Sequence, residues 1–343
     1  MRKLLNTLFV LSEDAYLALE GENIVILREE QQTARFPLHT LEAILSFSYK
    51  GASPALMGKC AELGIELAFH TPTGRFLARI CGESRGNVLL RKEQFRRSDD
   101  PVQSALIGRQ FVLGKVYNSR WVLERATRDH SLRVDVPELK HISDQLNRAL
   151  GDIAACEELE RLRGLEGETA AAYFSVMDQL ILQNKEEFAF TQRSRRPPLD
   201  RFNALLSFVY TLLAGQCAAA LEGVGLDSYV GFLHRDRAGR RSLALDLMEE
   251  LRPLLGDRFV LSLINNRVVR PEHFTLRENG AVLLDDDGRK AVFSAWQERK
   301  KEVLEHPFLE EKLPWGLVPH VQALLLARFL RGDLDAYPPF LWK

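Results

Sequence analysis

The sequence predicts an α+β protein, with a β-rich N-terminal domain followed by an all-helical C-terminal domain. Over the first 95 residues, short β-branched, aromatic and aliphatic segments alternate with turn-forming clusters. From about residue 105 onward, apolar residues recur at intervals of three and four, as they do in amphipathic helices. The length of 343 residues also favours two domains over one.

The N-terminal strands are predicted from apolar segments that lie between turns. A helix at residues 54–63 interrupts them, because Ser53 is a good N-cap, Pro54 suits the first helical position and Gly64 suits the position after the last turn. A hairpin is expected to follow this helix through the turn sequence Thr-Pro-Thr-Gly. The predicted strands are Thr7–Leu11, Tyr16–Leu19, Ile24–Leu27, Ile65–His70 and Phe76–Ile80.

The domain boundary is placed where the alternation stops. Residues 85–105 are rich in Arg, Lys, Ser and Asp, so we expect an N-terminal domain over 1–95, a linker over 96–105 and a helical domain over 106–343. Within the helical domain, Asp200 and Gly223 bracket one helix. Asn279-Gly280 between short apolar runs predicts a type I′ hairpin at 274–284.

Composition narrows the class of protein. Apolar residues make up 46% and charged residues 27%, as in soluble globular proteins, and no apolar run approaches the roughly 20 residues that span a bilayer. We therefore expect a cytoplasmic protein without a membrane partner. The net charge of −1 argues mildly against nucleic-acid binding unless basic residues gather on one face. No CxxC pair is present, which indicates free thiols at Cys60, Cys81, Cys156 and Cys217.

The first candidate functional segment is RGLEGETAAAYF, residues 163–174. Gly164 and Gly167 flank Glu166 and would permit close approach of another backbone or a bulky ligand. The alternative is that Glu166 is a solvated carboxylate at the start of a helix.

The second segment, residues 225–241, ends an apolar stretch at His234 and opens a basic loop. A histidine at such a border is suited to metal binding or acid–base work. The alternative is a histidine that caps the C-terminal end of a helix. The neighbouring basic residues could hold a DNA backbone: Arg235, Arg237, Arg240 and Arg241.

The third segment, residues 242–253, is apolar enough for a mostly buried helix that carries Asp246, Glu249 and Glu250 on adjoining positions of one face. Like charges this close repel each other, so they need a cation, arginine partners or solvent. Arg252 is the simplest partner, and a divalent metal is the other.

Together, the three segments offer several carboxylates and one imidazole. A ligand set of several oxygens and one nitrogen suits Mg²⁺ or Mn²⁺, and the histidine nitrogen favours Mn²⁺ of the two. Metal-assisted attack on a phosphodiester is compatible with such a set. The other histidines are interpreted as surface or capping residues: His39, His70, His130, His141, His273, His306 and His320.

These segments resemble the Cas-one family, the integrases of CRISPR adaptation. The motifs that carry the resemblance are RGLEGETAAAYF, GLDSYVGFLHRDRAGRRSLALDLMEELRP and DRFVLSLINNR. In the N-terminal domain, SPALMGKCAELGIELAFHTPTGRFLARI is also similar to that family. The resemblance spans nearly the whole chain, and its N-terminal pattern looks most like the type I-C branch.

The resemblance implies a homodimer formed through the N-terminal domain, with the helical domain as the catalytic one. It places the catalytic and metal-binding residues of the family on Glu166, His234 and Glu249. Asp246 corresponds to an acidic position near the site and is implied as support or as an alternate metal ligand. Glu250 stays a rival for Glu249, since both lie one turn beyond Asp246.

The function implied is a metal-dependent DNA endonuclease and integrase that uses Mg²⁺ or Mn²⁺. It would insert short foreign-DNA spacers into a CRISPR array by transesterification, in complex with the Cas-two protein. Double-stranded DNA, as prespacer and as repeat, would be the substrate, and a Cas-four nuclease is a candidate further partner. Two other functions stay open: a nuclease of branched or repair-intermediate DNA, and a catalytically silent DNA-binding scaffold.

Further DNA contacts are expected at two basic runs, for which a solvated face or a flexible linker is the alternative. The runs are Arg91, Lys92, Arg96 and Arg97, and Arg193, Arg195 and Arg196. Tyr173 and Tyr229 flank candidate ligands, and core packing is the preferred interpretation of Tyr173.

Overall fold

The computed structural model describes residues 6–71, 76–80, 82 and 88–343, and it confirms the α+β class. The chain divides into two compact units. The N-terminal unit comprises Met1–Arg85 and Leu284–Glu302, and the C-terminal unit comprises Gly86–Leu283 and Val303–Lys343.

The N-terminal unit contains two sheets. In the first, β1, β5 and β6 run parallel, and β7 pairs antiparallel with β6. In the second, β2, β3 and β4 form an antiparallel meander. The turn predicted between β6 and β7 falls at positions 72–75, outside the described residues. The strands are β1 (Asn6–Val10), β2 (Tyr16–Glu20), β3 (Asn23–Arg28), β4 (Gln31–Pro37), β5 (Leu41–Ser46), β6 (Glu66–His70) and β7 (Phe76–Arg79).

Helix α1 (Pro54–Leu63) has the bounds that the sequence predicts. The Ser53 side chain accepts a hydrogen bond from the Leu56 amide, and Pro54 occupies the first turn. Gly64 ends the helix in the left-handed region with φ of 69°. The helix buries Leu56 and Cys60 in the core of this unit.

Helix α9 (Asp286–Lys301) belongs to the N-terminal unit although it lies far along the chain. The Phe293 ring stacks on Phe9 with 4.0 Å between ring centroids. The Lys300 ammonium donates to the Thr7 hydroxyl at 2.9 Å. The predicted domain ranges keep this helix with the C-terminal part, because an apolar period reveals a helix but not the surface on which it packs.

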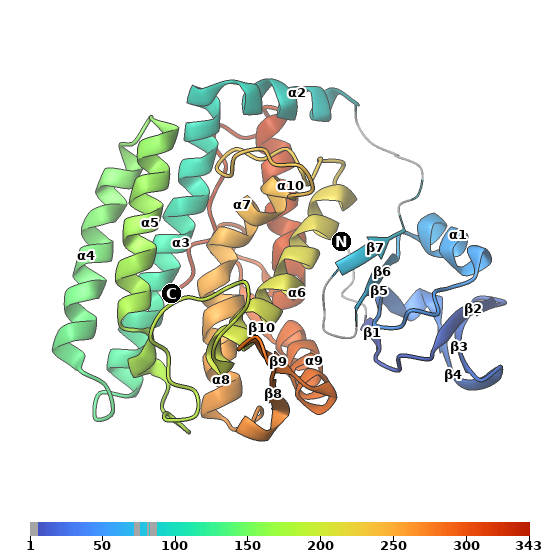
Figure 1. The fold of residues 1–343 in the computed structure, drawn as a ribbon. Coiled ribbons are helices and arrows are strands. Elements are labelled where there is room, and N and C mark those ends of the chain that lie inside the picture. Colours follow the sequence, from blue (N-terminus) through green and yellow to red (C-terminus); the bar gives the residue numbers. More distant parts are fainter. Residues whose placement is uncertain (1–5, 72–75, 81, 83–87) are drawn as a thin grey trace. The chain divides into compact units, whose positions relative to one another are not determined.

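The C-terminal unit is mainly helical, and Figure 1 shows α3, α4 and α5 lying side by side in it. Residues 96–105, predicted as a linker, lie in helices α2 and α3, and the Asp100 side chain between the two caps α3. The helices are α2 (Val88–Asp99), α3 (Pro101–Asp129), α4 (Val136–Ala154), α5 (Leu159–Ser175), α6 (Arg201–Gly223), α7 (Ser242–Leu251), α8 (Arg258–Asn265) and α10 (Val318–Leu330).

Helix α6 is the one described helix that is long and apolar enough to cross a membrane by length and composition. It packs against α7 and α10 in the core of the C-terminal unit. Its side chains Phe202, Leu205, Leu206 and Val209 are fully buried. Its apolar character is therefore explained by burial inside the protein.

The C-terminal unit also holds two short β-ribbons, β8–β9 and β10–β11, so it is not purely helical. The hairpin of β8 (Phe274–Leu276) and β9 (Val282–Leu284) is confirmed, but the type I′ turn is wrong. A type I′ turn needs a positive φ at both central residues, and of Asn279 and Gly280 only Gly280 has one, of 77°. The reason is that the loop is longer than two residues: the Arg277 amide donates to the Ala281 carbonyl. The other ribbon pairs β10 (Val303–Glu305) with β11 (Lys312–Pro314).

The cysteines agree with free thiols. Cys60, Cys156 and Cys217 are free and buried, and Cys81 lies outside the described residues. Burial raises the pKa of the Cys60 thiol to about 11, so this side chain stays protonated.

The prediction that His306 lies at the surface is wrong, because its side chain is fully buried. Its Nδ1 accepts from the Phe308 and Leu309 amides at 3.3 and 3.2 Å, and its Nε2 lies 3.1 Å from the Gln322 side-chain oxygen. The backbone contacts agree with the predicted capping role. Burial lowers the pKa of His306 against the opposing effect of Gln322.

This lowered pKa predicts a loss of stability in acid. In the unfolded chain His306 is protonated near the ordinary histidine pKa, whereas in the folded chain it is protonated only at lower pH. The stabilisation is therefore present above the ordinary pKa and is lost as pH falls. Between about pH 7 and about pH 5, the advantage of wild type over His306→Gln in free energy of unfolding should shrink. Urea unfolding at both pH values measures it, and an unchanged difference would contradict the prediction.

Candidate active site

Glu166 lies in the middle of α5 rather than at a helix start, so that alternative is wrong. A Cβ added at Gly164 or Gly167 would meet nothing within 4 Å, which shows that no other part of the described chain packs closely there. One turn further on, Ala170 and Ala171 line a cavity together with Glu166. The small residues around Glu166 therefore leave open space beside its carboxylate.

His234 lies in the loop between α6 and α7 and is not a helix cap. Its Nδ1 is 2.6 Å from Asp246 Oδ1, and a carboxylate oxygen can only accept, so Nδ1 carries the hydrogen. In the neutral ring, Nε2 is then the acceptor, and it lies 3.9 Å from Glu249 Oε1. Burial disfavours the charged ring, but Asp246 and Glu249 outweigh it and raise the pKa of His234.

Asp246 is fully buried and holds the loop around His234. Its Oδ2 accepts from the Phe232 and Leu233 amides at 2.7 and 3.0 Å, and its Oδ1 accepts from the His234 amide at 3.0 Å. With the imidazole contact, both oxygens are fully used. These contacts suit a residue that orients the histidine ring.

Glu249 and Glu250 point to different parts of the unit, so the predicted single acidic face does not include Glu250. The Glu250 carboxylate accepts from Gln322 Nε2 at 3.0 Å, from the Phe340 amide at 2.7 Å and from the Tyr337 hydroxyl. Burial, against these three donors, raises the pKa of Glu250 to about 7. The structure therefore removes Glu250 from the neighbourhood of His234.

Glu249 is surrounded by cations. Arg252, three residues further along the chain and just beyond the end of α7, contacts Oε1 at 2.7 Å, as its spacing in the sequence predicts. The Lys115 ammonium, from α3, lies 2.7 Å from Oε2 and also contacts Glu166 Oε1. Burial opposes ionisation, but the charges of Arg252 and Lys115 outweigh it and hold the pKa of Glu249 well below its usual range.

Arg252 begins a π-helical segment, Arg252–Asp257, that follows α7 directly. Such segments are frequent at functional sites. The Arg252 guanidinium stacks over Tyr210, 4.9 Å from the ring centroid, and the Tyr210 hydroxyl donates to Asp257. Gly256 permits this packing, since a Cβ there would lie 2.6 Å from the Tyr210 ring. Burial raises the pKa of Asp257 to about 6.

A cavity of about 340 Å³ adjoins the Glu166 carboxylate. Its wall combines charged and aromatic side chains: Lys115, Glu166, Phe174, Phe190, Arg195 and Arg252 are among them. Of the second basic run, Arg195 and Arg196 are exposed, whereas Arg193 turns inward and donates to the Asn203 side chain at 2.7 Å.

The first basic run lies in helix α2, where two of its side chains make contacts within the unit and two are exposed. Arg91 donates to the Gly225 carbonyl at 3.2 Å, and Arg97 stacks over Phe329 and pairs with Glu93. Lys92 and Arg96 are exposed. In the loop after His234, Arg235 pairs with Glu160 of α5 at 2.6 Å. Of the two flanking tyrosines, Tyr173 is buried and Tyr229 is exposed, in agreement with core packing for Tyr173.

Sequence reasoning missed the residues that assemble the site. Lys115 lies in an apolar stretch of α3 next to Gly114, and a lysine at such a position is the signal that could have singled it out. Gln94 of α2 donates to the Asp227 and Val230 carbonyls at 2.8 Å and anchors the loop before His234. Arg163 of α5 donates to the Leu233 carbonyl at 2.7 Å.

No ready-made cluster of three His, Cys, Asp or Glu side chains is present among the described residues. The reason is visible at Glu166 and Glu249, whose carboxylates converge on the ammonium of Lys115 instead of on each other. Two carboxylates that already meet at one cationic atom, beside a histidine with a free Nε2, fit the donor set of a divalent cation.

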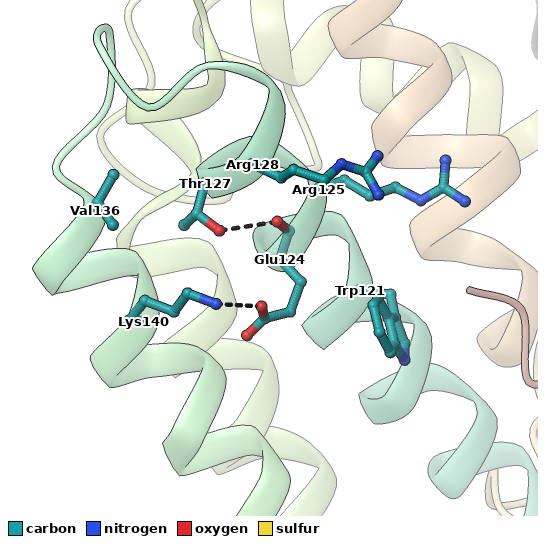
Figure 2. Close-up of a pocket in the computed structure, with 7 residues that line it drawn as sticks. All are labelled: Trp121, Glu124, Arg125, Thr127, Arg128, Val136 and Lys140. Atoms are coloured by element: carbon teal, nitrogen blue, oxygen red, sulfur yellow. Dashed lines mark hydrogen bonds and ion pairs between the residues drawn. The ribbon is translucent and has the colours of Figure 1, made fainter.

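A second cavity, of about 280 Å³, lies between α3 and α4 and shares no lining residue with this site. Figure 2 shows Trp121 and Arg125 on its wall, and the ion pair between Lys140 and Glu124 across the two helices. None of its lining residues is a candidate ligand.

The close packing of the His234 loop around Asp246 predicts that alanine at Gly231 and alanine at Gly167 will change stability differently. A Cβ at Gly231 would lie 2.8 Å from Asp246 Oδ2 and 2.8 Å from the Ser242 Cβ, so Gly231→Ala should cost about 1–3 kcal/mol of stability. Gly167→Ala, where a Cβ meets nothing, should be neutral or gain up to about 1 kcal/mol from helix propensity. Denaturant unfolding measures both, and equal effects would contradict this account of the loop.

Comparison with known proteins gives several matches. Residues 8–298 match the family described as CRISPR associated protein Cas1. The chain is 52% identical to CRISPR-associated endonuclease Cas1 2 of Rhodospirillum rubrum over 347 residues, and 48% identical to CRISPR-associated endonuclease Cas1 1 of Chlorobaculum tepidum over 343 residues. Both alignments cover 100% of each chain. A CRISPR-associated exonuclease Cas4/endonuclease Cas1 fusion of Geobacter sulfurreducens is 34% identical, over 98% of this chain and 60% of the fusion.

Two solved structures have the same fold. A casposase bound to integration product superposes with a TM-score of 0.84 at 20% identity, over 98% of this chain and 93% of that one. A chain of a Cas6-RT-Cas1–Cas2 complex superposes with a TM-score of 0.80 at 21% identity, over 100% of this chain and 36% of that one. The family match and the two full-length relatives confirm the resemblance seen in the motifs: this chain belongs to the Cas1 family of CRISPR-associated endonucleases.

Proposed function

We infer that this chain is a metal-dependent DNA endonuclease and integrase that inserts short foreign-DNA spacers into a CRISPR array. The observation that carries the inference is that Glu166 from α5 and Glu249 from α7 converge on one nitrogen atom, the Nζ of Lys115. Two carboxylates brought together from separate helices, beside an oriented histidine, are costly for a fold and are typical of a site for a cation.

The proposed metal ligands are Glu166, His234 and Glu249, and the proposed ion is Mg²⁺ or Mn²⁺. His234 would offer Nε2, because Asp246 already binds its Nδ1. Asp246 is proposed as a positioning residue, since three amides and the imidazole occupy its oxygens. The ion would supply positive charge that polarises the phosphodiester and stabilises its transition state.

The reaction proposed is transesterification. The 3′-oxygen of the DNA fragment forms a bond to phosphorus in the repeat strand, and the bond from that phosphorus to the 3′-oxygen of the neighbouring nucleotide breaks. The proton of the attacking hydroxyl is passed on balance to the leaving oxygen. One phosphodiester replaces another, so no ATP is needed. Water in place of the fragment hydroxyl would give strand cleavage by the same site.

The cavity beside Glu166 is the proposed seat for DNA at this site. Exposed Arg195 on its wall suits a phosphate, and Phe174 and Phe190 suit a base or sugar. Exposed Arg196 and Arg237 would extend the contact along the backbone. A net charge of −1 is compatible with this, because the basic side chains gather around the cavity and the His234 loop.

The proposed partners are double-stranded DNA, a second copy of the chain and a Cas2 protein. The structural relative in a Cas6-RT-Cas1–Cas2 complex supports Cas2, and the Cas4/Cas1 fusion supports a Cas4 nuclease as a further partner. A homodimer formed through the N-terminal domain and the type I-C branch are proposed from the sequence resemblance, and a cytoplasmic location is proposed from the composition.

The function is tested with a Cas2 partner, a fragment bearing 3′-hydroxyls and a plasmid that carries the repeat, in Mn²⁺ or Mg²⁺. Glu166→Gln should lower strand transfer at least about 100-fold, the scale of removing one group that stabilises transition-state charge. Glu168→Gln is the matched control: it lies on the same helix and is exposed, and should leave the rate unchanged.

The products separate the alternatives. Joined strands that vanish in Glu166→Gln while DNA binding persists support the integrase. Product that is nicked but never joined would favour the nuclease of branched or repair-intermediate DNA. Strand transfer that survives both Glu166→Gln and His234→Ala would place any chemistry elsewhere and favour the scaffold.

A further inference from the structure

Lys115 is the central cation of the candidate site. Its side chain is 6% exposed, and its ammonium contacts Glu166 Oε1 and lies 2.7 Å from Glu249 Oε2. These are the two carboxylates proposed as metal ligands, and each uses one oxygen on the same nitrogen atom. A buried ammonium is costly unless opposite charges surround it, so the two glutamates and Lys115 hold each other in place.

The charges of this group are already balanced. Two carboxylates, Glu166 and Glu249, face two basic side chains, Lys115 and Arg252. Arg252 is fixed by its stacking on Tyr210, whereas Lys115 has a long flexible side chain. A divalent cation that binds the same carboxylate oxygens would meet the ammonium at close range, and two like charges a few ångströms apart repel strongly in a buried site.

The structure provides a place for the ammonium to go. Lys115 and Glu166 both line the cavity of about 340 Å³, so the lysine can leave the carboxylates by turning into that space without unfolding α3. The nearby buried Asp257 lies within the electrostatic reach of Lys115. Movement of one side chain is therefore enough to free an oxygen on each glutamate.

We propose that Lys115 is a resident counter-ion that keeps the site assembled without metal, and that the divalent cation must displace it. This inference rests on the proposed metal site. The observed free energy of metal binding is then the free energy of binding the ion to the carboxylates minus the free energy needed to break two lysine–glutamate contacts. The same lysine would limit metal binding in the absence of DNA.

The test measures Mn²⁺ binding to the full chain without DNA, by calorimetry and by the shift of melting temperature. Lys115→Gln removes the charge and keeps a polar side chain of similar length. It should bind Mn²⁺ at least about 10-fold tighter than wild type, because no ammonium has to be displaced. Without metal it should melt lower than wild type, and Mn²⁺ should raise its melting temperature more.

Two variants serve as controls. Lys115→Arg keeps a permanent charge at the same position and should bind Mn²⁺ no tighter than wild type. Lys140→Gln removes a lysine that also pairs with a glutamate, across α3 and α4 and away from the site (Figure 2), and should match wild type in affinity.

The outcomes distinguish this inference from the proposed function. Equal or weaker Mn²⁺ binding by Lys115→Gln, with clear binding by wild type, overturns the role of Lys115 and leaves the metal site standing. Absence of Mn²⁺ binding in both overturns both. If Lys115→Gln is unfolded without metal, refolding on addition of Mn²⁺ supports the exchange of one cation for the other, and failure to refold overturns it.

Discussion

Helix α7 buries three carboxylates within five residues, and much of the C-terminal unit is arranged to satisfy them. Asp246, Glu249 and Glu250 are each at most 2% exposed. A buried carboxylate without partners costs several kcal/mol, so each has a separate set of donors. Asp246 takes backbone amides and an imidazole, Glu249 takes Lys115 and an arginine, and Glu250 takes the C-terminal tail. The position of the helix is thereby fixed from three sides.

This arrangement separates the three acids by role. The Asp246 contacts fold the loop that presents His234, which leaves Nε2 of the ring near Glu249. The Glu250 contacts connect α7 to α10 through Gln322 and to the tail after α10 through Tyr337 and Phe340. Only Glu249 faces the second carboxylate, Glu166. The site is therefore supported by hydrogen bonds to backbone and tail groups that take no part in the proposed chemistry, as expected for a preorganised centre.

Local signals in the sequence predicted the local structure well. The caps at Ser53 and Gly64 bound α1 correctly, since they act through hydrogen bonds and backbone angles within one turn. The N-terminal strands and the start of α6 after Asp200 followed from the same kind of pattern. Polar composition near residue 100 was a poorer guide: it suggested a linker where two helices meet, because exposed helices are also polar. Motif resemblance identified the family and selected Glu249 over Glu250.

The sequence by itself determined the α+β class and the family, and it predicted three residues as metal ligands. Periodicity, capping and motif spacing are properties of neighbouring residues, and the sequence displays them directly. Only the tertiary structure decided which groups meet. It brought α9 to the N-terminal unit, turned Glu250 toward the tail, used both oxygens of Asp246 on the His234 loop and placed Lys115 between Glu166 and Glu249. These contacts join residues far apart in the chain, and burial and charge balance in the folded state select them.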